Sequence, residues 1–104
     1  MAGAAFAPVI FGLTGAALGP EERAFFRSIN PLGFILFARN CERPGQVRAL
    51  TDELRECLGR DAPILIDQEG GRVTRLNPPH WRKPPPAAVF GELFERDPDL
   101  ALAA

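Results

Sequence analysis

The chain has 104 residues, 46% of them hydrophobic and 24% charged, with a formal net charge of −1. This composition is typical of one small globular domain and excludes a disordered or fibrous chain. Acidic and basic side chains are interspersed, and no basic stripe indicates nucleic acid binding. No apolar stretch has the length of a membrane span. Neither nucleic acid nor a membrane is therefore expected as a partner.

The sequence up to residue 66 alternates apolar runs with helical patterns. Strands are predicted at residues 8–13, 34–37 and 64–66. A helix is predicted to start at residues 19–22, where proline and two glutamates suit a first turn, and to stop at residues 30–33. A second helix is predicted from Pro44 to a C-terminal cap at Gly59. This alternation predicts a parallel α/β sheet with right-handed crossovers, whose strands are buried on both faces.

Periodicity does not distinguish an open parallel sheet from a closed barrel. In either case the strands should lie side by side and carry Ile10, Phe11, Ile35, Leu36, Ile64 and Leu65. The helices should cover them with Phe25, Ile29, Leu50 and Leu54. Residues 77–86 contain five prolines and predict a stiff extended loop. A short helix is expected at residues 87–94, and another should start near Asp97.

The most informative stretch follows the third predicted strand. The apolar run 64–66 stops at Asp67, and Glu69, a Gly70-Gly71 pair, Arg72 and Arg75 follow. Polar groups at the carboxyl end of a buried strand typically face a ligand in α/β proteins. Such acceptors and donors suit a molecule with many hydroxyls, such as a sugar. The alternative is structural, with Asp67 as a cap and Arg75 paired with Glu69.

Two motifs carry a family resemblance. Residues 67–76 read Asp-Gln-Glu-Gly-Gly-Arg-Val-Thr-Arg-Leu, and residues 30–40 read Asn-Pro-Leu-Gly-Phe-Ile-Leu-Phe-Ala-Arg-Asn. In this order and spacing they resemble the bacterial β-N-acetylhexosaminidases of glycoside hydrolase family three. The resemblance implies a (β/α)8 barrel, of which residues 1–104 would be the truncated N-terminal βαβαβ portion of a single catalytic domain. The unfinished last helix and the exposed third strand agree with a longer parent protein.

The resemblance also implies roles for individual residues. Asp67 and Arg75 would bind the non-reducing N-acetylglucosamine, with Asp67 accepting hydrogen bonds from its hydroxyls. From their positions in the chain, Glu69, Gly70, Gly71 and Arg72 are expected to support the loop. Arg39 and Asn40, which follow the second strand, are expected to brace it. No catalytic residue is assigned within the chain, because the family's nucleophilic aspartate and acid/base histidine are expected beyond Ala104. That role is therefore not transferred to His80. No metal ion or organic cofactor is implied.

The implied parent enzyme removes terminal β-linked N-acetylglucosamine with retention, from muropeptides during peptidoglycan recycling. The N-terminus lacks the positive region of a secretory signal, and Cys41 and Cys57 have no metal or redox spacing, so free thiols and a cytoplasmic location are expected. The parent enzyme is expected to be a monomer. Residues 1–104 alone should lack catalysis. Two alternatives are a small α/β module that binds a phosphorylated ligand and a non-catalytic paralogue. Against the first, Gly70-Gly71 does not fit a phosphate-binding glycine pattern.

Overall fold

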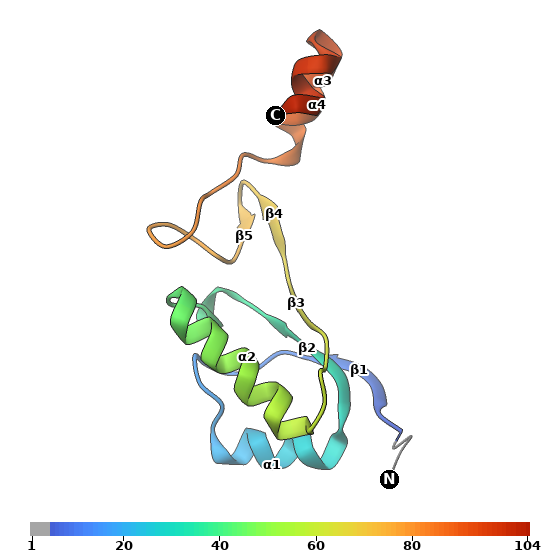
Figure 1. Ribbon diagram of the computed structural model, residues 1–104, viewed down its shortest axis with the longest axis vertical. Helices are drawn as coiled ribbons and strands as arrows, with labels where there is room; N and C mark the ends of the chain where they lie inside the picture. The colour runs from blue at the N-terminus through green and yellow to red at the C-terminus, as the bar shows by residue number, and fades with distance from the viewer. Residues whose placement is uncertain (1–4) are drawn as a thin grey trace. The chain divides into compact units, whose positions relative to one another are not determined.

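The computed structural model describes residues 5–104 (Figure 1). Residues 1–4, which are part of the segment without a positive signal region, lie outside the described residues. The chain divides into two compact units, the first ending at Ile66 and the second running from Asp67 to Ala104. Within residues 5–104, no helix combines the length and the apolar character needed to cross a membrane.

The first unit contains a parallel sheet in the order β1 (Ala7–Phe11), β2 (Pro31–Leu36) and β3 (Ile64–Ile66). Phe34 of β2 is paired with Phe11 on one side and with Ile64 on the other. The crossovers contain α1 (Pro20–Ile29) and α2 (Pro44–Leu58). The predicted parallel α/β arrangement of these strands is confirmed.

Both helices end at residues in the left-handed region. The Asn30 N–H, at φ 51°, donates to the Phe26 carbonyl, and Gly59, at φ 69°, ends α2 as predicted. Because Asn30 ends α1 so sharply, β2 begins at Pro31, three residues before its predicted start at residue 34. Gly33 therefore lies inside β2, where a Cβ would be only 3.2 Å from the backbone carbonyl carbon of Pro63. The glycine permits close approach of two backbones rather than stopping a helix.

The hydrophobic core lies between the helices and one face of the sheet. Phe26 of α1 packs edge-to-face on Phe34 at a centroid distance of 4.9 Å, and Leu50 and Leu54 of α2 are fully buried. The prediction is confirmed for Leu50 and Leu54. Phe25 packs edge-to-face on Phe11 of β1, with ring centroids 5.5 Å apart, but is 47% exposed. The prediction is wrong for Ile29, which is 38% exposed, because Phe26 occupies the part of α1 that faces the sheet.

The opposite face of the sheet is largely uncovered within the described residues. Side chains alternate between the faces of a strand, so Ile10, Ile35 and Leu65 lie opposite to Phe34. Ile10 is 41% exposed and Leu65 is 44% exposed. The expected burial on both faces is therefore not found in residues 5–104, because α1 and α2 pack on the same face.

The second unit begins with a feature that the sequence interpretation did not include. Strands β4 (Gln68–Gly70) and β5 (Val73–Thr74) form an antiparallel hairpin where a loop was predicted. Residues 77–86 contain no helix or strand, as predicted. Helix α3 (Ala87–Arg96) is followed by α4 (Pro98–Ala103), and the Asp97 carboxylate caps α4 by accepting from the Leu100 N–H.

Candidate functional site

The glycine pair forms the tip of the β4–β5 hairpin. Gly70 has φ 87° and Gly71 has φ 58°, backbone angles that residues other than glycine rarely adopt. The Gly71 N–H donates to the Pro84 carbonyl at 3.2 Å, and a Cβ at Gly70 would lie 3.0 Å from the same oxygen. A Cβ at Gly71 would lie 2.9 Å from Cβ of Pro86. The close approach that the glycines permit is thus to the chain's own proline segment.

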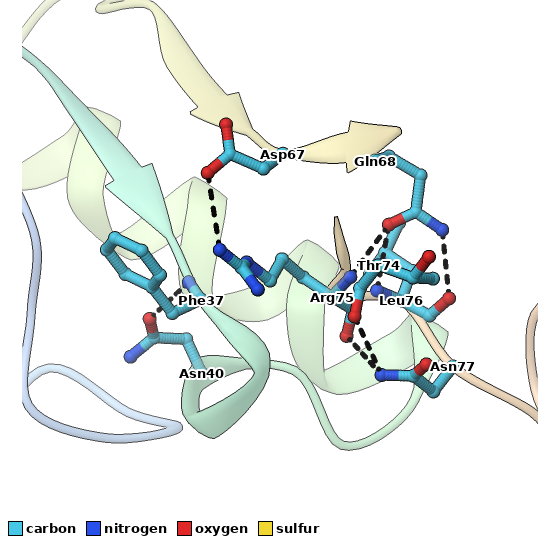
Figure 2. Close-up of polar contacts among 8 residues, drawn as sticks. All are labelled: Phe37, Asn40, Asp67, Gln68, Thr74, Arg75, Leu76 and Asn77. Atoms are coloured by element: carbon cyan, nitrogen blue, oxygen red, sulfur yellow. Dashed lines mark hydrogen bonds and ion pairs between the residues drawn. The ribbon is translucent and has the colours of Figure 1, made fainter. Parts of the chain in front are cut away.

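An ion pair joins the two ends of the hairpin. Oδ2 of Asp67, immediately after β3, lies 3.4 Å from Nη2 of Arg75, immediately after β5 (Figure 2). The Asp67 side chain is 44% exposed and that of Arg75 is 27% exposed. The pair therefore presents acceptor and donor atoms to solvent, as a polar ligand would require. The structure brings together the two residues that were predicted to bind substrate.

Gln68 connects the two ends of the hairpin through backbone groups. Its Oε1 accepts from the N–H groups of Arg75 and Leu76, both at 3.0 Å, and its Nε2 donates to the Leu76 carbonyl at 2.9 Å. On the other side, Asn77 Nδ2 donates to the carbonyls of Thr74 and Arg75, each at 3.2 Å. Sequence reasoning overlooked Gln68 and Asn77, because their contacts exist only once the hairpin has formed.

The other residues predicted to support this loop differ in their surroundings. Glu69 and Arg72 are exposed on the hairpin, and neither side chain has a hydrogen bond or ion pair within residues 5–104. Their supporting role remains a prediction. His80 and Trp81 contact each other edge-to-face in the proline-rich segment, with ring centroids 5.9 Å apart.

Arg39 and Asn40 lie in the first unit, in the short helix η1 (Ala38–Asn40) that follows β2. Asn40 is fully buried, and its Nδ2 donates to the carbonyls of Leu13 and Gly15 at 3.1 and 2.7 Å. Arg39 Nε also donates to the Leu13 carbonyl, at 3.0 Å. Both residues therefore fasten the β1–α1 loop. Their predicted support of the Asp67 segment remains a prediction.

Gln46 of α2 joins the β1–α1 loop to the segment that follows β2. Gln46 Nε2 donates to the carbonyls of Ala16 and Asn40, both at 2.7 Å, and its Oε1 accepts from the Glu42 N–H at 2.7 Å.

Cys41 and Cys57 are free thiols, as predicted, and burial raises the pKa of the Cys41 thiol. A raised pKa lowers the thiolate fraction, so Cys41 is not an activated nucleophile.

The hairpin presents charged side chains to solvent. Within residues 5–104 no pocket is formed, and no cluster of three or more His, Cys, Asp or Glu side chains could hold a metal ion. Asp67 and Arg75 form a partly exposed polar pair, and Asp67 directly follows a strand of the parallel sheet. The chain is therefore an α/β protein with a partly exposed acid and base after a strand end, where proteins of this class commonly bind ligands.

Comparison with known proteins shows which members of this class the chain resembles in sequence. The chain is 41% identical over 96 residues to a β-hexosaminidase of Alkalilimnicola ehrlichii and 43% identical over 97 residues to one of Chromobacterium violaceum. These alignments cover 92% and 91% of the chain but only 27% and 26% of those proteins. The chain thus spans about a quarter of the length of the curated relatives it matches. No family model matches the chain.

A solved structure supports the same relationship as the sequence comparisons. NagZ from Neisseria gonorrhoeae in complex with N-trifluoroacetyl-D-glucosamine matches 92% of the chain with a TM-score of 0.85 and 29% identity, and the match covers 29% of that protein. The resemblance to the bacterial β-N-acetylhexosaminidases indicated by the two motifs is therefore confirmed.

Proposed function

We propose that the full-length protein is a retaining β-N-acetylhexosaminidase that removes terminal β-linked N-acetylglucosamine. In this proposal residues 1–104 are the N-terminal portion of a single (β/α)8 catalytic barrel. Asp67 accepts hydrogen bonds from sugar hydroxyls, and Arg75 donates to the same sugar. This chain then contributes one wall of the sugar site.

The observation that carries the proposal is the Asp67–Arg75 pair, 3.4 Å apart and partly exposed immediately after strand β3. A carboxylate beside a guanidinium offers both acceptors and donors to a molecule with vicinal hydroxyls. The named NagZ structure binds a glucosamine derivative, which supports an amino sugar as the ligand. The uncovered apolar sheet face around Ile10 and Leu65 supports the barrel, whose interior is packed with branched side chains.

Hydrolysis with retention requires a nucleophile and an acid/base group on opposite sides of the glycosidic bond. In this proposal both come from later strand ends and loops of the barrel. Residues 1–104 alone then form one wall of the sugar site but do not catalyse hydrolysis of the sugar. No step requires a metal ion or organic cofactor.

The test is hydrolysis of 4-nitrophenyl β-N-acetylglucosaminide by the purified full-length protein. The matched control is 4-nitrophenyl β-glucoside, which lacks the acetamido group. We expect rapid release of nitrophenol from the first substrate only, with the β anomer of the sugar appearing first by NMR. A protein that binds the sugar without hydrolysing it would show that the chain belongs to a non-catalytic paralogue.

The proposed biological substrate is an N-acetylglucosamine-containing muropeptide, processed in the bacterial cytoplasm by a monomer during peptidoglycan recycling. The related N. gonorrhoeae protein was solved with a glucosamine derivative, which is compatible with such a substrate. Release of N-acetylglucosamine from purified muropeptides, cell fractionation and analytical ultracentrifugation test the three parts of this assignment. Activity on the chromogenic glycoside without activity on muropeptides would contradict the recycling role.

A further inference from the structure

We propose that Gln68 is a positioning residue that fixes the location of the Arg75 guanidinium by holding the backbone at Arg75 and Leu76. This inference rests on the proposed function of Asp67 and Arg75 in sugar binding. It assigns a role to the first residue of strand β4, which directly follows the strand-end acid.

The contacts of Gln68 extend the hairpin beyond its regular ladder. Gln68 is paired with Thr74, where β5 ends. Past that point no strand continues, and the Gln68 side chain satisfies both N–H groups and one carbonyl of Arg75 and Leu76. An amide side chain has both an acceptor and a donor, so it can bond the backbone groups that a neighbouring strand would otherwise bond.

The position of Arg75 depends on this replacement. An arginine side chain has many rotamers, so the direction of its guanidinium is defined only if its backbone is fixed. The Arg75 N–H is held by Gln68 and its carbonyl by Asn77, while its Nη2 reaches Oδ2 of Asp67. Figure 2 shows the carboxylate of Asp67 directed at the guanidinium and the Gln68 amide beside the backbone of Arg75 and Leu76. Gln68 therefore acts through Arg75 rather than on the sugar.

A double-mutant cycle in the full-length protein tests this role. Gln68→Met keeps the length of the side chain but removes its three hydrogen bonds. Small displacements of a binding group reduce catalysis strongly, so we expect kcat/KM for the chromogenic N-acetylglucosaminide to fall by roughly ten- to a hundredfold. In the Arg75→Ala background the same change should cost less than about threefold, because the group that Gln68 positions is gone.

Gln46→Met is the matched control, since Gln46 also makes three side-chain hydrogen bonds to main-chain groups but lies in the first unit. Gln46→Met should change kcat/KM by the same factor in the parent and in the Arg75→Ala background. Should Gln68→Met fail to fold, Gln68→Asn replaces it in the cycle, because it keeps an amide but is one methylene too short to retain all three hydrogen bonds. Equal factors for the Gln68 variant in both backgrounds would overturn the positioning role alone. An inactive unsubstituted protein would instead overturn the proposed function.

Discussion

Asp67 and Arg75 are joined across the β4–β5 hairpin by an ion pair of 3.4 Å, although eight positions separate them in the sequence. Both side chains are partly exposed, at 44% and 27%, and a pair of this kind contributes only about 0–1 kcal/mol to folding. The hairpin is held by the Gln68 and Asn77 hydrogen bonds instead. The ion pair is thus available for a ligand without being needed for the fold.

The tip of the hairpin should tolerate no side chain at Gly70. Gly70→Ala forces alanine to φ 87° and places a Cβ 3.0 Å from the Pro84 oxygen, so we expect a loss of about 1–3 kcal/mol in the free energy of unfolding. Denaturant unfolding of the full-length protein measures it. The matched control is Gly91→Ala in α3, where an added Cβ meets nothing within 4 Å and should stabilise the helix by about 0.5–1 kcal/mol. A neutral Gly70→Ala would contradict the close approach.

Asn40 should be a determinant of stability in the first unit. Asn40→Ala removes a fully buried amide that bonds the Phe37 N–H and the Leu13 and Gly15 carbonyls, so we expect a loss of about 1–3 kcal/mol in the free energy of unfolding. Thr51→Ala removes only a surface hydrogen bond to the Arg48 carbonyl within α2 and should stay within about 0.5 kcal/mol of the parent. Thermal unfolding of both variants gives the comparison. Similar melting temperatures for the two would show that the loop does not depend on Asn40.

The parallel strands and α2 could be predicted because their signals are local. Apolar runs mark the strands, and Pro44 and Gly59 mark the ends of α2. The hairpin could not be predicted in this way, since β4 and β5 are too short for a repeating pattern and are fixed by contacts with residues 84–86. Asp67 and Arg75 are recognisable in a motif, whereas the role of Gln68 depends on atoms that meet only in three dimensions.

The uncovered face of the parallel sheet should be buried in the full-length protein if the barrel is correct. Leu65 is 44% exposed here, whereas Leu50, on the face of α2 that packs on the sheet, is fully buried. In a closed barrel Leu65→Ala should cost about 2–5 kcal/mol, as expected for Leu50→Ala. Denaturant unfolding of the two full-length variants decides the matter. A cost below about 1 kcal/mol for Leu65→Ala, with the expected cost for Leu50→Ala, would contradict a packed barrel interior.

Residues 1–104 expressed alone should be prone to aggregation. The face containing Ile10 and Leu65 and the free edge of β3 would both be open to other molecules. We expect strong binding of a hydrophobic dye and concentration-dependent association in ultracentrifugation. The full-length protein at the same concentration is the control. A monomer with a cooperative thermal transition and native-like near-ultraviolet dichroism would refute this expectation.

Asp67→Asn should separate sugar recognition from stability. The substitution keeps the size of the side chain, and the lost ion pair contributes at most about 1 kcal/mol, so the melting temperature should change little. A carboxylate accepts hydrogen bonds from two hydroxyls with both oxygens, whereas an amide has one accepting oxygen. Bonds to charged groups contribute about 1.5–3 kcal/mol, so losing one that tightens in the transition state should lower kcat/KM by roughly ten- to a hundredfold.

The measurement is hydrolysis of the chromogenic N-acetylglucosaminide by full-length parent and variant, with circular dichroism as the control for folding. Arg75→Ala should give a smaller loss of the same kind, because water can occupy the space left by the truncated donor. Asp52→Asn, on the exposed surface of α2, is the matched control for the change of carboxylate to amide and should retain the parental kcat/KM. A folded Asp67→Asn variant with parental kcat/KM would show that the Asp67 carboxylate does not bind the sugar.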